Sequence, residues 1–201
     1  MRAIVDIETD SLDATKIHCV VAKDIDTGKV YPFPPNLLHG FRDWSHGVDQ
    51  FIMHNGLSFD APILNRILKT NIKPNQVIDT LILSQLFNPI RDDGHSLEAW
   101  GKRLQMPKGE VETFDIYTDD MLEYCKQDVN ITHRLYDILK QEGRGFSKSS
   151  IDLEHKIRVI LDQQQYNGFA LDLQKTMCLF NQLKDEAYEL EKWGRTHFDP
   201  T

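Results

Sequence analysis

Two carboxylates interrupt the first apolar stretch of the chain, residues 2–8 (RAIVDIE). This pattern is typical of a mostly buried β-strand with one polar edge. Because side chains at positions i and i+2 share one face of a strand, Asp6 and Glu8 should project side by side. An exposed strand end is the ordinary explanation of Asp-x-Glu, but two charges in a core-like strand are costly unless a cation or hydrogen bonds compensate them. The pair is therefore a candidate metal-binding site.

Two later segments add acidic side chains of the same kind. Asp60 follows an Asn-Gly break in HNGLSFD (54–60) and opens a helical pattern, where it could also be a simple N-cap. In YCKQD (124–128), the i, i+4 spacing places Tyr124 and Asp128 on one helix face, although an exposed acid beside a core tyrosine has the same pattern. Each ordinary explanation is reasonable for one segment alone. The conjunction of all three segments favours a common site.

Four carboxylates from separate elements can hold two divalent cations about 3.5–4 Å apart. Such a pair of cations clamps the attacking and leaving oxygens of a phosphodiester, so the predicted reaction is hydrolysis of a nucleic-acid strand. Mg²⁺ is the expected cation, with Mn²⁺ as a substitute, because all-oxygen sites favour these ions. The predicted metal ligands are Asp6, Glu8, Asp60 and Asp128, and Tyr124 completes the predicted catalytic set.

The rest of the sequence predicts the elements that carry these residues. Strand patterns occur at 2–8, 17–22, 30–33, 50–54 and 76–78. Helical periodicity occurs at 60–70, 80–86, 96–104 and 119–141, and a looser stretch separates the third and fourth strands. Asp79 and Ser96 are expected to cap the helices that follow them. A meander of strands followed by strands alternating with helices predicts an α/β fold, with helices packed on the faces of a mixed sheet.

The C-terminal part of the chain has a different pattern. Residues 149–165 and 173–197 both have the periodicity of amphipathic helices, and no strand pattern remains. Gly, Arg and Ser replace the apolar stripe at 143–147, which indicates a boundary there. We therefore expect one domain over 1–145 and a helical extension over 146–201.

Composition limits the partners and the compartment. The 201 residues include 23 Lys and Arg against 31 Asp and Glu, a net charge of −8, which argues against broad binding of duplex DNA and leaves only local contact with nucleic acid. No apolar run approaches the roughly 20 residues that span a bilayer, and no signal-peptide pattern follows Met1, so we expect no membrane partner and a cytoplasmic location. Cys19, Cys125 and Cys178 are too far apart in the sequence to predict a disulfide framework or a zinc site.

The three acidic segments also resemble a known set of motifs. DIET (6–9), HNGLSFD (54–60) and YCKQD (124–128) are similar to the three motifs of DEDD-superfamily 3′-to-5′ exonucleases, in the proofreading order. The histidine subclass has a His five positions before the last Asp, where this chain has Glu123, whereas Tyr124 stands four positions before it. The resemblance is thus to the tyrosine subclass. It implies an RNase H-like fold, a five-stranded mixed sheet flanked by helices.

A narrower resemblance is to the proofreading domain of family A DNA polymerases of short-tailed bacteriophages. It rests on DIETDSL (6–12), VIDTL (77–81) and GHSLEAWGKRL (94–104), and it continues in DLEH (152–155) and QYNGF (165–169). It implies that 146–201 resembles the start of a polymerase domain. The chain stops before any segment that resembles the polymerase palm. We therefore expect no polymerase activity in this chain, which would be a fragment or one half of a split enzyme, with a polymerase domain or subunit as its partner.

The resemblance also implies roles for individual residues. Asp6, Glu8 and Asp128 would hold the cation that activates the attacking water. Asp6 and Asp60 would serve a second cation near the leaving 3′ oxygen, and Tyr124 would orient the nucleophile. Thr9 would contact the terminal nucleotide and Leu12 would wedge against its base, while Asn55 and Phe59 would shape the path of the strand.

The expected activity is release of nucleoside 5′-monophosphates from a single-stranded or frayed 3′ end of DNA. Such an enzyme would proofread during phage replication in the host cytoplasm. Two alternatives stay open: an exonuclease that processes RNA 3′ ends, and a non-catalytic nucleic-acid-binding module.

Overall fold

The structure is a computed structural model that describes residues 1–107, 109, 111 and 113–198. The chain divides into two compact units, Met1–Gln163 and Gln164–Thr201. The three acidic segments all lie in the first unit.

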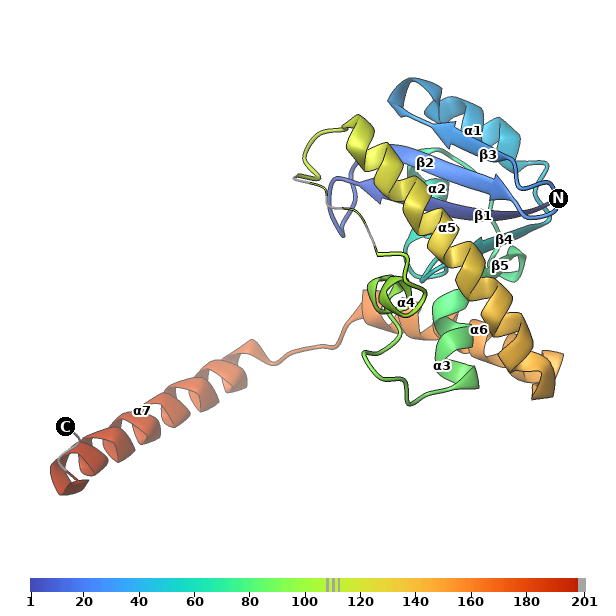
Figure 1. Ribbon diagram of the computed structural model, residues 1–201. Helices are drawn as coiled ribbons and strands as arrows, with labels where there is room; N and C mark the ends of the chain where they lie inside the picture. Colours follow the sequence, from blue (N-terminus) through green and yellow to red (C-terminus); the bar gives the residue numbers. More distant parts are fainter. Residues whose placement is uncertain (108, 110, 112, 199–201) are drawn as a thin grey trace. The chain divides into compact units, whose positions relative to one another are not determined.

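In the described residues, the first unit is built on a five-stranded mixed sheet with the strand order β3-β2-β1-β4-β5 (Figure 1). The strands are β1 (Arg2–Thr9), β2 (Ile17–Asp24), β3 (Val30–Phe33), β4 (Gln50–Met53) and β5 (Val77–Asp79). β1 pairs antiparallel with β2 and parallel with β4, and β4 is parallel to β5. The predicted mixed sheet is confirmed, and the strand that carries Asp6 and Glu8 lies at its centre.

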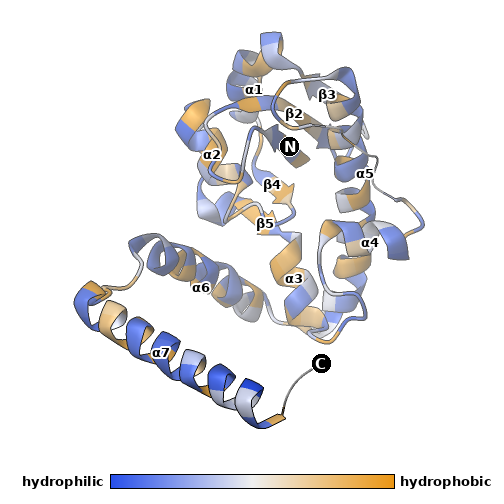
Figure 2. Cartoon of the chain, turned by 90° about the vertical axis from the view of Figure 1, so that its left-hand side faces the viewer, coloured by the Kyte–Doolittle hydropathy of each residue, from blue (hydrophilic) through white to orange (hydrophobic). Residues whose placement is uncertain are grey.

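Alternate side chains of β1 enter two different hydrophobic cores. The helices that cover the sheet are α1 (Leu38–Ser45), α2 (Asp60–Ile67), α3 (Thr80–Phe87), α4 (Leu97–Arg103) and α5 (Asp119–Glu142). Val5 and Ile7 pack in one core with residues of α1 and α2, whereas Ile4 packs in the other core with residues of α3, α4 and α5. Figure 2 shows the apolar character of β4 and β5, which lie between the two cores. Because Asp6 and Glu8 share the face of Ile4, β1 directs both carboxylates toward the α5 side.

The prediction of a loose stretch between the third and fourth strands is wrong. A short 3-10 turn over Pro35–Leu37 leads into the eight-residue helix α1. Phe41 is completely buried, its ring stacks on Trp44 at 5.8 Å between centroids, and the edge of Phe33 meets it at 5.4 Å. Packing of this aromatic cluster stabilises a helix that is too short to form on its own propensity.

Two helices, α6 (Lys148–Asn167) and α7 (Leu173–Phe198), form the predicted helical extension. The division between the compact units falls inside α6, because the earlier part of α6 packs on the first unit. The domain boundary expected after residue 145 stays a prediction, as does the likeness of 146–201 to a polymerase domain; residues 199–201 lie outside the described part. In the described residues, no helix combines the length and the apolar character needed to cross a membrane.

Candidate active site

Asp6 and Glu8 lie side by side on the face of β1 that α5 covers. The Sγ atom of Cys125, in α5, is 3.4 Å from both the backbone oxygen and Oδ2 of Asp6, which can share its S–H donor. One potential ligand atom from each of Asp6, Glu8 and Cys125 lies within 4.8 Å of the other two. The pair expected from the sequence is therefore present, within reach of one cation.

Helix α5 brings the last motif to the same place. It packs on β1 and β2, and its N-cap Thr118 accepts a hydrogen bond from the N–H of Met121. Asp128 follows Cys125 by three residues, nearly one turn, and is 3% exposed. The helix face that carries Asp128 is thus the one that touches Asp6. Tyr124, four residues before Asp128, is half-buried.

Asp60 is the first residue of α2 but does not cap the helix. The N-cap residue is Phe59, and no side-chain cap bond is present there. The backbone N–H groups of Ile7 and of Asp60 itself instead act on the carboxylate and favour its charged form. The N-cap explanation of Asp60 is therefore wrong, and its carboxylate lies beside the C-terminal half of β1.

Burial, together with the negative charges of Asp79 and Asp128, raises the pKa of Asp60 from 3.8 to about 8. The N–H groups of Ile7 and of Asp60 itself oppose this rise. Asp60 is only 4% exposed, so little water screens these charges. The charge of Asp128 acts on Asp60, so the second and third acidic segments are within electrostatic range of each other.

The four predicted ligands are of a chemical type that suits a divalent cation. Among the described residues, the ligand atoms that lie within 4.8 Å of one another are those of Asp6, Glu8 and Cys125, and this group does not include Asp60 or Asp128. The carboxylates of Asp6, Glu8, Asp60 and Asp128 are hard oxygen ligands of the kind that Mg²⁺ and Mn²⁺ prefer. A cation beside Asp60 would also offset the burial and the neighbouring charges that raise its pKa. Both features fit the metal site expected from the sequence, and the individual ligands stay proposals.

The residues expected to bind the substrate lie next to these carboxylates in the chain. Thr9 ends β1, and its Oγ1 donates a hydrogen bond to the backbone oxygen of Ser11 at 2.9 Å. Leu12 is 90% exposed, an unusual position for a large apolar side chain. Asn55 and Phe59 belong to the loop that leads into α2. The roles of these four residues stay predictions.

Asp79 does more than cap α3. As a cap, its carboxylate accepts hydrogen bonds from the N–H groups of Leu81 at 2.9 Å and Ile82 at 3.4 Å. The same carboxylate accepts from the N–H groups of Asn55 at 3.0 Å and Leu57 at 3.1 Å. Burial raises the pKa of Asp79, which is 1% exposed, and these four hydrogen bonds oppose the rise. The sequence predicts the cap, and nothing in it indicates the second pair of bonds.

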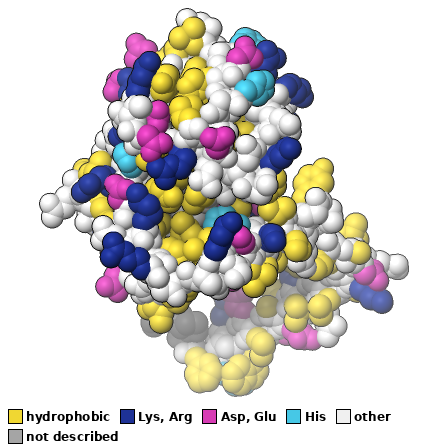
Figure 3. Space-filling model, turned by 90° about the vertical axis from the view of Figure 1, so that its right-hand side faces the viewer, with side chains coloured by type: hydrophobic (Ala, Val, Ile, Leu, Met, Phe, Trp, Pro, Cys, Tyr) yellow, Lys and Arg dark blue, Asp and Glu magenta, His cyan; other side chains and the backbone are white. Residues whose placement is uncertain are grey.

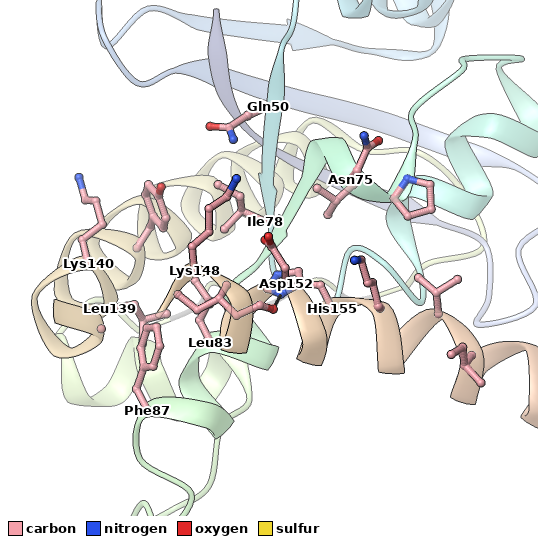
Figure 4. A pocket seen from close by; sticks show the side chains of 18 residues that line it. Gln50, Asn75, Ile78, Leu83, Phe87, Leu139, Lys140, Lys148, Asp152 and His155 are labelled. Atoms are coloured by element: carbon pink, nitrogen blue, oxygen red, sulfur yellow. Dashed lines mark hydrogen bonds between the residues drawn. The ribbon is translucent and has the colours of Figure 1, made fainter. Parts of the chain in front are cut away.

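A cavity of about 890 Å³ lies elsewhere in the first unit, bordered by β5, α3, α5 and α6 (Figure 4). Ile78, Leu83 and Phe87 are among the hydrophobic side chains that line it, and Lys140 and Lys148 also border it. Figure 3 shows a face on which hydrophobic side chains lie among Lys and Arg side chains. The described lining includes none of the carboxylates gathered around β1, so this cavity is separate from the candidate active site.

Comparison with known protein families defines the class to which this fold and site belong. Residues 4–144 match the family described as 3′–5′ exonuclease. The chain therefore belongs to the 3′–5′ exonuclease family, as its three motifs predict.

Among individual relatives, the chain is similar to the DNA-directed DNA polymerases of Escherichia phage T7 and Enterobacteria phage T3. Each is 26% identical to it, over 92% of this chain and 35% of the relative. The chain thus spans about a third of the length of these relatives.

Solved structures with the same fold include NrnC from Brucella melitensis with bound Mg²⁺, with a TM-score of 0.62 and 23% identity over 85% of this chain and 89% of that one. The catalytic core of RRP6 from Trypanosoma brucei has a TM-score of 0.60 and 15% identity, over 81% of this chain and 46% of that one. These likenesses confirm the predicted RNase H-like fold.

Proposed function

We propose that the chain is a proofreading exonuclease that hydrolyses DNA from the 3′ end with the help of two divalent cations. One observation carries the proposal. The carboxylates of β1 face α5, where Cys125 touches Asp6, while Asp128 of the same helix acts on the pKa of Asp60. Three acidic segments far apart in the sequence are therefore close together in a chain of the 3′–5′ exonuclease family.

In the proposed reaction, the oxygen of a water molecule attacks the terminal phosphorus and the bond from phosphorus to the 3′ oxygen breaks. A nucleoside 5′-monophosphate is released, and the strand keeps a new 3′ hydroxyl. Bound divalent cations would supply activation of the water and stabilisation of the leaving oxygen. Asp6, Glu8 and Asp128 would hold one cation, and Asp6 with Asp60 would serve the other. Tyr124 would orient the water through its hydroxyl rather than remove a proton from it.

The substrate end would be bound by Thr9, Leu12, Asn55 and Phe59. The exposed side chain of Leu12 can contact the face of any base, which suits an enzyme that acts without sequence preference. A frayed or mismatched 3′ end is a favourable substrate because its bases are already unstacked. These contacts agree with a proofreading role.

The relatives support the finer parts of the proposal. Similarity to phage DNA polymerases supports DNA as substrate, a polymerase domain or subunit as partner, and the host cytoplasm as the place of action. The Mg²⁺ bound in NrnC supports Mg²⁺ as the cation. Mn²⁺ would substitute for it, because both ions accept an all-carboxylate site.

The test is a degradation assay on single-stranded DNA and RNA of the same sequence, labelled at either end. We expect 5′-labelled DNA to shorten one nucleotide at a time in Mg²⁺ or Mn²⁺, and 3′-labelled DNA to release labelled mononucleotide at once. Asp6→Ala should lower the rate by about 10³-fold or more, since a cation contributes several kcal/mol to the transition state. Asp92→Ala removes an exposed acid and is the matched control.

Three results would contradict the proposal. Internal cleavage products would indicate an endonuclease, and activity that persists in EDTA would exclude the cation chemistry. Faster degradation of RNA than of DNA would favour the RNA-processing alternative.

A further inference from the structure

We propose that helix α6 is a positioning element of the nuclease site, which acts through His155 and Asp162 on the loop over residues 54–59. The proposal rests on the proposed function, because this loop leads directly into Asp60. Neither residue would touch the substrate or the cations. Both residues would instead hold in position the groups that touch the substrate or the cations.

The loop has a backbone conformation that needs support from outside it. Asn55 has a φ of +62°, in the left-handed region, which asparagine adopts more readily than most residues other than glycine. A Cβ atom on Gly56 would lie 2.2 Å from the Cβ of Met53, so only glycine fits there. Such a segment keeps one shape only when surrounding contacts determine it.

The first of these contacts connects α6 to the loop through β5. The carboxylate of Asp79 accepts hydrogen bonds from the N–H groups of Asn55 and Leu57. The backbone N–H of Asp79 in turn donates to Nε2 of His155 at 3.0 Å, and Figure 4 shows His155 on α6, next to β5. Nδ1 of His155 is 2.8 Å from the backbone oxygen of Ile151, so the proton belongs on Nδ1 and Nε2 is free to accept.

The second contact connects α6 directly to the loop. Oγ of Ser58 donates a hydrogen bond to Oδ2 of Asp162 at 2.7 Å. His155 and Asp162 are seven residues apart, about two helical turns, so they lie on the same face of α6. Both residues belong to the first compact unit. The helix therefore supports the loop at two separate points.

Support of the loop matters because the loop ends at Asp60, which is the first residue of α2. The backbone N–H of Ile7 in β1 acts on the Asp60 carboxylate, and a shift of the loop would move this carboxylate relative to β1. Since Asp60 is proposed to serve a cation, loss of the α6 contacts should weaken cation binding more than it weakens the fold.

The experiment uses paired variants of the full chain. His155→Ala and Asp162→Ala each remove a hydrogen-bond acceptor, whereas His155→Gln and Asp162→Asn each keep an acceptor oxygen. Asp152→Ala removes an exposed acid from the same helix and is the control. The measurements are the Mn²⁺ dissociation constant by titration calorimetry, the Mg²⁺ dependence of single-turnover DNA hydrolysis, hydrogen exchange over residues 53–61, and the melting temperature.

We expect each alanine variant to weaken Mn²⁺ binding about three- to thirtyfold, the effect of losing one partly buried hydrogen bond. The half-saturating Mg²⁺ concentration should rise in parallel, and amide exchange in the loop should become faster. The Gln and Asn variants should restore most of the affinity, and Asp152→Ala should resemble the wild type.

The proposal is overturned if both alanine variants bind Mn²⁺ as the wild type does, or if Asp152→Ala weakens binding equally. A lower melting temperature with unchanged cation affinity would show a merely structural role and overturns it as well. If the wild type does not degrade DNA, the proposed function fails, while the Mn²⁺ titration and the exchange data still decide whether α6 positions the loop.

Discussion

Asp60→Asn should stabilise the cation-free protein at alkaline pH while it abolishes nuclease activity. Burial holds the pKa of Asp60 at about 8, whereas the unfolded chain ionises this carboxyl near 3.8. An acid with a raised pKa binds more protons in the folded state, so its contribution to stability is complete below about pH 4 and is lost as the pH rises toward 8. Asparagine does not titrate, so the free energy of unfolding of the variant does not fall with pH for this reason.

The size of the effect follows from the two pKa values. Each pH unit between 3.8 and about 8 removes about 1.4 kcal/mol from the free energy of unfolding. The loss reaches on the order of 4 kcal/mol at pH 7 and about 5–6 kcal/mol at pH 9. These are upper bounds, because water that enters the site reduces the cost of the charge. Even half of this is a large part of the roughly 5–15 kcal/mol that stabilises a typical domain.

Urea denaturation in EDTA at pH 5, 7 and 9 measures this difference. The stability of Asp60→Asn relative to the wild type should increase with pH, and its amide oxygen can still interact with the N–H of Ile7. Asp92→Asn, at an exposed position, should follow the wild type at each pH. Mg²⁺ should restore stability to the wild type at pH 9 and much less to Asp60→Asn. Parallel pH profiles for the two proteins, or a variant less stable than the wild type at pH 9, would refute the reasoning.

Three further predictions concern the same unit. Tyr124→Phe should slow single-turnover hydrolysis about 10- to 100-fold and leave the half-saturating Mg²⁺ concentration unchanged, because it removes an orienting hydroxyl and no ligand; a higher Mg²⁺ requirement would speak against that role. In thermal denaturation, Gly56→Ala should lower the free energy of unfolding by about 2 kcal/mol or more, since its Cβ would overlap Met53. Gly145→Ala is the control; open space surrounds this position, so the free energy of unfolding should change by less than about 1 kcal/mol. EDTA should lower the melting temperature of the wild type at pH 8 but hardly that of Glu8→Gln, which lacks a proposed ligand; equal shifts would contradict the metal site.

The sequence predicts most of the fold because most elements carry their own signal. Short apolar runs, bounded by turn residues and in β1 partly alternating, identify the strands, and the helical period identifies α2 through α7. Helix α1 is the exception. Its eight residues give too short a pattern, and it forms because Phe41 and Trp44 pack against Phe33, a contact that depends on the folded sheet.

The sequence predicts the acidic residues of the site better than their surroundings. The spacing of Asp6 and Glu8 on a strand, and of Tyr124 and Asp128 on a helix, fixes which side chains share a face. The contact between Cys125 and Asp6 depends on how α5 lies across β1, which no local pattern encodes.

The two buried acids beside the loop show what separates a structural carboxylate from a candidate ligand. Asp79 is partly compensated by the fold itself, because its carboxylate accepts the N–H groups of Asn55 and Leu57 in addition to those of its own helix, although burial raises its pKa as well. The N–H groups of Ile7 and of Asp60 itself act on the Asp60 carboxylate, and its pKa still rises to about 8. Burying a carboxylate without sufficient compensation lowers the stability of the fold. A carboxylate that is buried in this way therefore indicates a requirement of function rather than of stability. For Asp60, the proposed cation would supply the compensation that the protein itself does not.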